Sequence, residues 1–353
     1  MSGTRITFHT GQDQQPEALA RVVDHVRAQL SGTALADLTS ARRPLFAGIG
    51  ASFAALAVPV EVLRAHAVPA QRVLASEIED GLAGFDTDVL VGVSQSGRSS
   101  ETLAAFRASG AVRTAAVLNV TPSPLADLAD VAVDLGNEPD SYASTIGFTA
   151  TVVALDLVAG ALAGRAGDAW DGIAGRLRTV RERAAATIEP LRARAAACVA
   201  ADCVASGASR ASAEEAALLL REVPRVPAAA SATRNYLHGE MESAGNTLHL
   251  VFGDGREIGL ARSLSDAGHL TLLVTTRDVE PGEHLGVVRL PDTEGPGPRV
   301  VLETAVVQEL VQALSAERDV PVEAFVFAND DTKEGGVDPG DFAIASPELT
   351  TGS

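Results

Sequence analysis

Short apolar runs alternate with helical patterns along most of the chain, and the clearest example is the stretch 88–107. The run 89–93 is almost wholly apolar, a polar loop follows it, and residues 102–107 begin a pattern of helical period. Runs of the first kind are typical of strands buried on both faces of a parallel sheet. We therefore predict a strand, a loop and a helix in this order.

The same alternation extends over the first half of the chain. Residues 4–14 are polar and predict irregular backbone, and Pro16 is expected to open a helix over 17–30. Further helices are expected at 54–66, 125–129 and 145–162, with a first strand and glycine turn over 45–53 and further strands at 72–75, 114–119 and 132–135. Strands and helices that alternate with short connections indicate a parallel sheet covered on both sides.

The pattern restarts after a segment rich in arginine and alanine, 168–201, which predicts one long linking helix. Strands are expected at 203–206, 247–252, 270–275 and 287–290, and helices at 211–222, 256–267 and 299–317. The fold class is therefore α/β, with two doubly wound parallel-sheet halves. We expect an N-terminal helical segment 1–30, a first half 31–167, the linking helix 168–201, a second half 202–330 and a tail 331–353.

The charge balance excludes several function classes. The chain has 28 basic and 46 acidic residues, a net charge of −18, and it contains no basic block. Such a chain is a poor ligand for nucleic acid or an anionic membrane. No apolar signal core and no run of the roughly 20 apolar residues that span a bilayer are present, so we expect a cytoplasmic protein.

The two cysteines, Cys198 and Cys203, lie in a segment rich in alanine and valine, without further ligands at zinc-site spacing. They are expected to be small buried hydrophobic residues. Nothing in the sequence points to a metal or an organic cofactor.

The loop Ser94-Gln-Ser-Gly-Arg-Ser-Ser100 is the first candidate binding site. A loop between a strand and a helix N-terminus offers free backbone N–H groups, the positive end of the helix dipole and hydroxyl donors, which suits a phosphate monoester. The alternative is a hydroxyl-rich helix cap without a ligand. In the second half the equivalent loop carries Asp254 and Glu257, which would repel phosphate, so one anion site is expected.

Several separated motifs resemble the double sugar-isomerase-domain (SIS) family, over about residues 13–330. The loop that begins at Ser94, followed by Glu101-Thr102, resembles the phosphate loop of that family. The other matching motifs are Gln15-Pro16, Ala47-Gly-Ile-Gly-Ala-Ser52, Ser141-Tyr-Ala-Ser-Thr145, Ala213-Glu-Glu-Ala-Ala-Leu218, Arg221-Glu222 and His238-Gly239.

The resemblance implies a role for each matching residue. The sugar phosphate would be held by Ser94, Gln95, Ser96, Ser99 and Thr102, with Ser52 assisting, and the segment with Ala143 and Ser144 would close over the sugar. Glu215 would be the general base that moves a proton between C1 and C2. His238 would open the sugar ring and reach the site of a neighbouring subunit, so a homodimer is expected. Glu222 would support the site.

Simpler interpretations of these residues remain open. Ser212 and Glu215 have the spacing of a capping box. Glu222 lies two turns further along the same helix face and could be solvated. Arg98, where the family has an acidic residue, could add charge to the phosphate pocket or be exposed. His249 and His269 have apolar or turn surroundings that favour structural roles.

The sequence also departs from the family. It lacks an N-terminal glutaminase domain and does not begin with Met-Cys, so ammonia from glutamine is not expected to be its chemistry. A lysine near the end of the family's synthases forms a Schiff base. Here Lys333 is the only lysine, and between acidic neighbours it is more simply a surface residue. Ile146 stands where the family has lysine.

The expected function is that of an amino-sugar phosphate isomerase or deaminase, which acts on a substrate like hexosamine 6-phosphate. Ring opening, C1–C2 proton transfer and release of ammonia would give a ketose phosphate. One alternative is a deglycase that cleaves an adduct of a sugar phosphate and an amine. The alternative from another class is a catalytically silent sugar-phosphate sensor, because the fold also serves as an effector-binding module.

Overall fold

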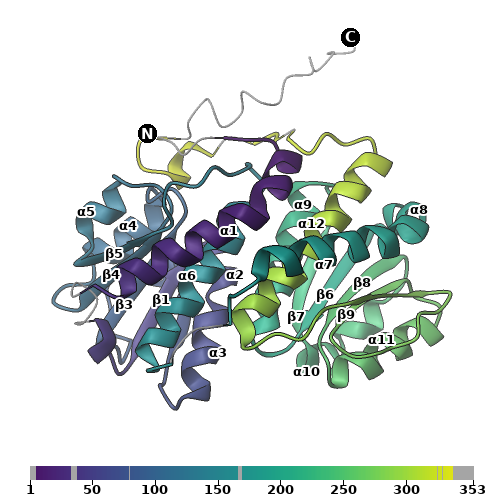
Figure 1. Ribbon diagram of the computed structural model, residues 1–353, viewed down its shortest axis with the longest axis horizontal. Helices are drawn as coiled ribbons and strands as arrows, with labels where there is room; N and C mark the ends of the chain where they lie inside the picture. The colour runs from purple at the N-terminus through teal and green to yellow at the C-terminus, as the bar shows by residue number, and fades with distance from the viewer. Residues whose placement is uncertain are drawn as a thin grey trace, which may run out of the picture.

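Two parallel sheets of five strands each form the centres of two similar halves, which lie side by side in Figure 1. The structure is a computed structural model that describes residues 5–32, 38–78, 80–165, 169–323, 325–327 and 329–336. Most of the expected tail 331–353 therefore lies outside the described residues, as do residues 166–168 before the second half.

The first sheet has the strand order β2-β1-β3-β4-β5, and all of its paired strands are parallel. Its strands are β1 (Pro44–Gly48), β2 (Gln71–Leu74), β3 (Val89–Ser94), β4 (Arg113–Leu118) and β5 (Val131–Asp134). The helices of this half are α1 (Phe8–Leu30), α2 (Ala51–Ala55), α3 (Ala57–Ala65), α4 (Ser100–Arg107), α5 (Pro124–Leu128) and α6 (Ile146–Leu162), with short 3₁₀ turns η2 (Leu38–Ser40) and η3 (Ala75–Ile78).

The second sheet, in the order β7-β6-β8-β9-β10, repeats this topology. Its strands are β6 (Ala200–Ala205), β7 (Ala228–Ala232), β8 (Thr247–Phe252), β9 (Thr271–Thr275) and β10 (Leu285–Arg289). The helices are α7 (Ile173–Ile188), α8 (Arg192–Ala196), α9 (Arg210–Glu222), α10 (Thr233–Tyr236), α11 (Arg256–Asp266) and α12 (Pro296–Glu317), with 3₁₀ turns η4 (Glu189–Leu191), η5 (Gly207–Ser209), η6 (Glu240–Ser243) and η7 (Asp330–Thr332). The predicted fold class is confirmed, because both halves are parallel α/β units.

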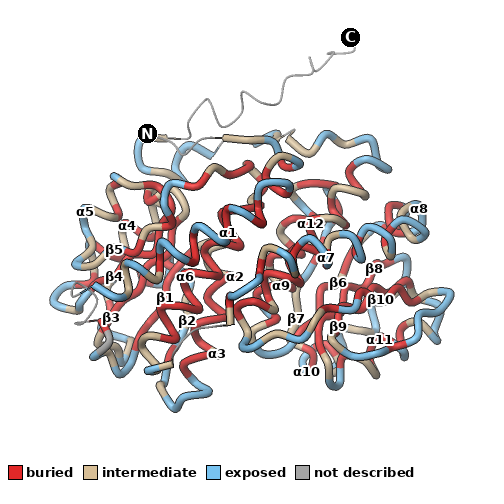
Figure 2. The backbone as a smooth tube through the Cα atoms, viewed as in Figure 1, coloured by how far each residue is buried: buried red, intermediate tan, exposed pale blue. Residues whose placement is uncertain are grey.

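The main core lies between the two sheets, where α1, α6, α7, α9 and α12 pack against one another. Figure 2 shows α1 and α7 as buried along one face and exposed along the other, whereas α6 is buried along most of its length because nearly all of its residues are apolar. Smaller cores lie under α4 on the outer face of the first sheet and under α11 on that of the second. In the described residues, no helix is both long and apolar enough to cross a membrane.

The N-terminal segment differs from the prediction, since residues 4–14 are not irregular throughout. Helix α1 begins at Phe8, with the side chain of Thr7 accepting from the N–H of Thr10, and Pro16 lies inside the helix. A proline removes the N–H that would bond the carbonyl four residues earlier. Here Arg181 Nη1 donates to that carbonyl, of Gln12, at 2.6 Å. A contact from a distant helix therefore compensates for the proline.

Two features of the second half were also predicted wrongly. The expected single helix over 168–201 is divided, because Pro190 lies in η4 between α7 and α8, and β6 begins already at Ala200. Strand β7 was missed. Its sequence, Ala-Ala-Ala-Ser-Ala, has no branched or aromatic residue, and it forms the edge of the sheet by pairing with β6.

Candidate active site

The loop after β3 begins at a buried strand end and runs into α4, as predicted. Ser94 is buried, and its hydroxyl lies 2.9 Å from that of Ser99. Gly97 adopts φ +65°, and a Cβ atom there would collide with the side chain of Ser123, so the turn requires glycine. The loop therefore holds its hydroxyl groups around the start of α4.

A cavity of about 190 Å³ opens at this loop, at the carboxyl ends of the first sheet. Its lining includes Ser52 and Ala51 from α2, Gln95, Ser96 and Ser99 from the loop, and a group before and within α6: Asp140, Tyr142, Ser144, Gly147, Phe148 and Thr151. Arg5 and Lys333 complete it from the two ends of the chain. Hydroxyl, amide and cationic groups thus face one small space.

The predicted phosphate-binding residues divide into two groups. Ser52, Gln95, Ser96, Ser99 and Ser144 line the cavity. Ser94, Thr102 and Ala143 are buried and are absent from that lining. The Thr102 hydroxyl has no hydrogen-bond partner among the residues that the structure describes. An unsatisfied buried hydroxyl is costly, so a ligand or water that reached it would stabilise the loop.

Asp140 organises the segment that was expected to close over the sugar. Its carboxylate accepts from the hydroxyl of Ser144 at 2.8 Å and from the N–H of Thr145 at 3.0 Å, and thereby caps α6. Burial raises the pKa of Asp140, although hydrogen bonds from Gly147, Ser144 and Thr145 oppose the shift. Gln15, from the separate matching motif Gln15-Pro16, contacts the same segment: its side-chain amide donates to the carbonyl of Thr145 at 3.0 Å.

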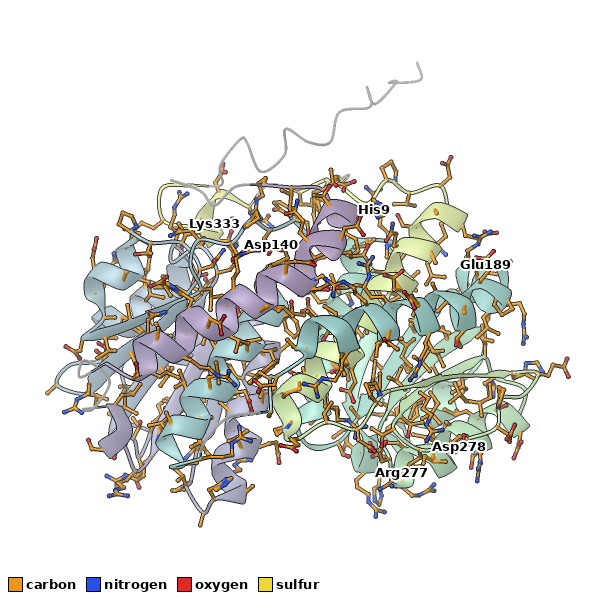
Figure 3. All side chains as sticks on the ribbon, in the orientation of Figure 1. His9, Asp140, Glu189, Arg277, Asp278 and Lys333 are labelled. Carbon is orange, nitrogen blue, oxygen red and sulfur yellow. The ribbon has the colours of Figure 1, made fainter. Side chains whose placement is uncertain are left out.

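Sequence reasoning missed Arg5, Asp140 and Tyr142 and interpreted Lys333 as a surface residue. In the structure Lys333 is half-buried and lines the cavity. Figure 3 shows Asp140 and Lys333 near each other above the first half. Asp140 and Tyr142 lie beside and within the motif 141–145, but the motif did not single them out. Arg5 and Lys333 come from opposite ends of the chain, which no local motif connects.

A second cavity, of about 590 Å³, shares Tyr142 with the first. Glu222, at the end of α9, lines it together with Arg221, Arg225, Val226, Pro227, Phe325, Val326, Phe327 and Asn329. Glu222 is half-buried, and burial raises its pKa to about 7. A carboxyl group that lines a cavity and titrates near neutral pH is suited to proton transfer. Glu222 is thus not simply solvated.

Glu215 has different surroundings. It is buried, and both of its carboxyl oxygens are enclosed without a hydrogen-bond partner among the described residues. Burial, and after it the charges of Glu222 and Asp140, raise its pKa well above the usual value. The capping-box interpretation is wrong, since Ser212 lies within α9 and its hydroxyl donates to Glu303 at 2.6 Å. Glu215 is absent from the linings of both cavities.

His238 follows α10 at the edge of the second half. It is exposed, and it lines neither cavity. Within a single chain, the structure therefore does not bring His238 together with the phosphate loop.

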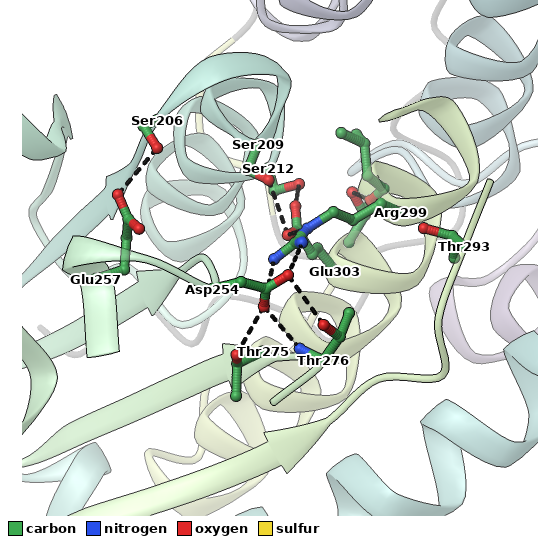
Figure 4. Close-up of polar contacts among 12 residues, drawn as sticks. Ser206, Ser209, Ser212, Asp254, Glu257, Thr275, Thr276, Thr293, Arg299 and Glu303 are labelled. Carbon is green, nitrogen blue, oxygen red and sulfur yellow. Dashed lines mark hydrogen bonds and ion pairs between the residues drawn. The ribbon is translucent and has the colours of Figure 1, made fainter. Parts of the chain in front are cut away.

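The loop after β8 has its own charged network, shown in Figure 4. Burial alone would raise the pKa of Asp254, but hydrogen bonds from Arg299, Thr276 and Thr275 outweigh it and hold the pKa well below its usual range. Glu257 accepts from Ser206 at 2.9 Å, from Thr233 at 2.7 Å and from the N–H of Gly255 at 3.3 Å. In the second half, the carboxylates of Asp254 and Glu257 therefore lie in the loop that corresponds to the loop 94–100 of the first half.

The remaining candidates have structural surroundings. Both cysteines are buried and unpaired. His249 is buried, and its Nδ1 atom lies 3.1 Å from the hydroxyl of Tyr236, which donates to Asp202 at 2.8 Å. In the part of the chain that the structure describes, no group of three or more histidine, cysteine, aspartate or glutamate residues could hold a metal ion.

Comparison with known proteins identifies the first half. Residues 37–161 match the family model of the SIS domain. No curated protein matches the sequence.

Solved structures resemble the whole chain. The C-terminal domain of glucosamine-fructose-6-phosphate aminotransferase from Francisella tularensis has a TM-score of 0.79 at 20% identity, over 91% of this chain and 98% of that one. Tagatose-6-phosphate ketose/aldose isomerase from Escherichia coli has a TM-score of 0.72 at 14% identity, over 91% and 96%. Glucosamine-6-phosphate deaminase from Thermotoga maritima has a TM-score of 0.67 at 17% identity, over 86% and 95%.

At these identities the likeness of the structures shows the fold, and the family model shows the domain. The chain therefore carries an SIS domain in residues 37–161, within a fold of two parallel sheets that it shares with these solved structures.

Proposed function

We propose that the protein is a sugar-phosphate isomerase or deaminase, with an amino-sugar phosphate such as a hexosamine 6-phosphate as substrate. The observation that carries this proposal is the pair of cavities that share Tyr142 in their linings. One offers hydroxyls, an amide and two cations for a phosphate group, and the other offers a carboxyl group that titrates near pH 7. A phosphate in the first cavity would direct the rest of the sugar toward the second.

The phosphate would bind to Gln95, Ser96 and Ser99 in the loop and to Ser52 opposite them. The start of α4 adds the positive end of a helix dipole. Ser94 and Thr102 would support the loop from behind, since both are buried. Ala143 and Ser144 would lie beside the sugar, in the segment that Asp140 holds through Ser144.

Glu222, rather than Glu215, is the group we propose for proton transfer between C1 and C2. A base must come within hydrogen-bond reach of the carbon-bound proton, and Glu222 lines a cavity whereas Glu215 is enclosed. With a pKa of about 7, Glu222 can both accept and return a proton at neutral pH. Glu215 lies on the same helix, and its carboxyl group, whose pKa is raised well above the usual value by burial and then by the charges of Glu222 and Asp140, would support the site in its protonated form.

Ring opening would be assisted by His238 of a second subunit, because the exposed His238 of the same chain lies outside the cavity lining. This proposal requires a homodimer. An equal mixture of Glu222→Gln and His238→Ala chains, each inactive alone, should then recover about a quarter of the wild-type activity. Half of all dimers would pair one chain of each kind, and one of the two sites in each such dimer would be intact. No recovery would place ring opening within one chain.

A deglycase is the second candidate, favoured by the size and lining of the cavity around Glu222. Its volume of about 590 Å³ lies in the range of about 300–1,000 Å³ for drug-sized ligands, larger than the opened end of a hexose requires. Val226, Pro227 and Phe325 form an apolar wall, and Arg221 and Arg225 could meet a carboxylate. An amino acid attached to the sugar would suit this lining.

Incubation with glucosamine 6-phosphate, while ammonia and fructose 6-phosphate are followed, separates the candidates. Release of both products establishes the deaminase, and conversion of a sugar phosphate to its ketose without ammonia establishes the isomerase. Turnover of a fructosyl-amino-acid 6-phosphate alone establishes the deglycase. If these compounds raise the melting temperature and none is turned over, the protein is a sensor and the enzymatic proposal is wrong.

A further inference from the structure

Residues 329–336, which we call the C-terminal strap, lie against the loop that follows β3. Lys333 forms an antiparallel bridge with Ser99, and the N–H of Glu334 donates to the carbonyl of Arg98 at 2.8 Å. The hydroxyl of Ser100 donates to the carbonyl of Asp331 at 2.7 Å. A segment more than 200 residues away in the sequence is thus paired with the candidate phosphate loop through its backbone.

The side chain of Arg98 fixes the course of the strap. Its Nε atom donates to the carbonyl of Glu334 at 2.9 Å, and its Nη2 atom donates to the carbonyl of Gly336 at 2.8 Å. Gly335, between them, adopts φ +82°, and a Cβ atom there would lie 2.9 Å from Arg98 Nη2. The forked guanidinium group therefore fits one backbone conformation, which a single ammonium group could not specify in the same way.

This anchoring determines where Lys333 lies. One residue before Glu334, Lys333 joins Ser96, Ser99 and Gln95 in the cavity lining, and Arg5 lies in the same lining. The carboxylate in that lining, Asp140, accepts hydrogen bonds from Ser144, Thr145 and Gly147 at the start of α6. Two cationic side chains thus line the cavity, of which Arg5 also donates to the carbonyl of Ser141 at 3.2 Å and interacts with Asp140.

We propose that Lys333 binds the phosphate of the substrate and that Arg98 is the positioning residue that holds it there. The inference rests on the proposed sugar-phosphate function. Arg98 is absent from the lining of this cavity, and its guanidinium group is bonded to the strap. The binding site would be complete only when the strap lies on the loop.

Because Lys333 is the only lysine in the sequence, endoproteinase Lys-C can report directly on the strap. We expect Arg98→Ala to be cut at least about tenfold faster than the wild type, since the strap would lose the two hydrogen bonds that Arg98 donates and keep those from Ser100, Arg107 and the backbone. Arg98→Lys should be cut nearly as fast as Arg98→Ala. Inorganic phosphate should slow the cleavage of the wild type. Arg262→Ala, an exposed residue of α11, is the matched control and should behave as the wild type.

Binding provides the second arm of the test. Calorimetric titration with inorganic phosphate and with glucosamine 6-phosphate should show affinities about tenfold or more weaker in both Lys333→Ala and Arg98→Ala, because a charged hydrogen bond is lost or misplaced. Binding of unphosphorylated glucosamine should not change. Lys333→Arg should retain most of the phosphate affinity.

Equal cleavage of the wild type and Arg98→Ala would overturn the role of Arg98. Unchanged phosphate affinity in Lys333→Ala would overturn the role of Lys333. Failure of the proposed function would look different: phosphate would still bind, and the Lys333 variant would still weaken it, but no sugar phosphate would be turned over.

Discussion

The ring of Tyr142, which lines both cavities of the site, lies 3.9 Å, centroid to centroid, from the ring of Phe325, which lines the cavity around Glu222. Tyr142 comes from the segment before α6, and Phe325 follows α12. The two rings are tilted by 53° to each other, and this contact links the segment before α6 to the wall of the cavity that holds Glu222.

The activity should depend on the ionisation of Glu222. Since burial raises its pKa to about 7 and a base must be ionised, kcat/KM should fall about tenfold per pH unit below that value and level off above it. A pH–rate profile of the wild type measures this directly. A profile that is flat between pH 5.5 and 7.5 would mean that another group is the base.

Ser96→Ala should weaken substrate binding with a smaller effect on turnover. The hydroxyl lines the phosphate cavity, and a hydrogen bond to a charged group contributes about 1.5–3 kcal/mol, so KM should rise about tenfold or more. Steady-state kinetics give the two constants separately. Ser263→Ala, whose hydroxyl donates to the carbonyl of Gly259 in α11, serves as control. An unchanged KM would remove Ser96 from the phosphate site.

The stability of the fold should depend on pH through Glu215. Its pKa is raised in the folded state, so the folded protein holds a proton that the unfolded chain releases near its usual value of 4.5. Stability from this group is complete below that value and is lost as the pH rises toward the folded pKa. The variant Glu215→Gln has no ionisable group at this position and therefore does not show this loss of stability as the pH rises. The melting temperature of the variant relative to the wild type should therefore increase from pH 5 to pH 8, whereas parallel curves would contradict the raised pKa.

Arg299→Leu should destabilise the second half strongly. Arg299 donates to both Asp254 and Glu303, and the side chain of Glu303 is fully buried. Breaking such an arrangement from one side costs about 3–5 kcal/mol. Urea unfolding measures the loss. Arg289→Ala, which removes an exposed ion pair with Asp278, should cost no more than about 1 kcal/mol. Equal effects of the two substitutions would contradict the account of this network.

The fold could be predicted from the sequence because most of its strands are apolar runs, such as β3 and β8, whose burial on both faces shows in the residue types. Two errors arose where distant contacts decide the structure. Arg181 allows Pro16 to lie within a helix, and pairing with β6 makes an alanine-rich segment a strand. No local pattern contains this information.

The candidate site was predictable where its residues belong to one loop. Gln95, Ser96 and Ser99 line the cavity as expected. The positions of Arg98 and Lys333 could not be predicted, because they depend on contact between segments more than 200 residues apart in the sequence. The access of Glu222 and the enclosure of Glu215 likewise depend on packing against α9, which the spacing of the two residues could not reveal.

The most direct test of the account is exchange of the C2 proton of glucosamine 6-phosphate in deuterated water, followed by NMR for the wild type, Glu222→Gln and Glu215→Gln. The account predicts exchange by the wild type, reduced but measurable exchange by Glu215→Gln and none by Glu222→Gln, while Glu222→Gln still binds the sugar phosphate. Exchange by Glu222→Gln at the wild-type rate, or its loss in Glu215→Gln alone, would contradict the assignment of Glu222 as the group that moves the proton.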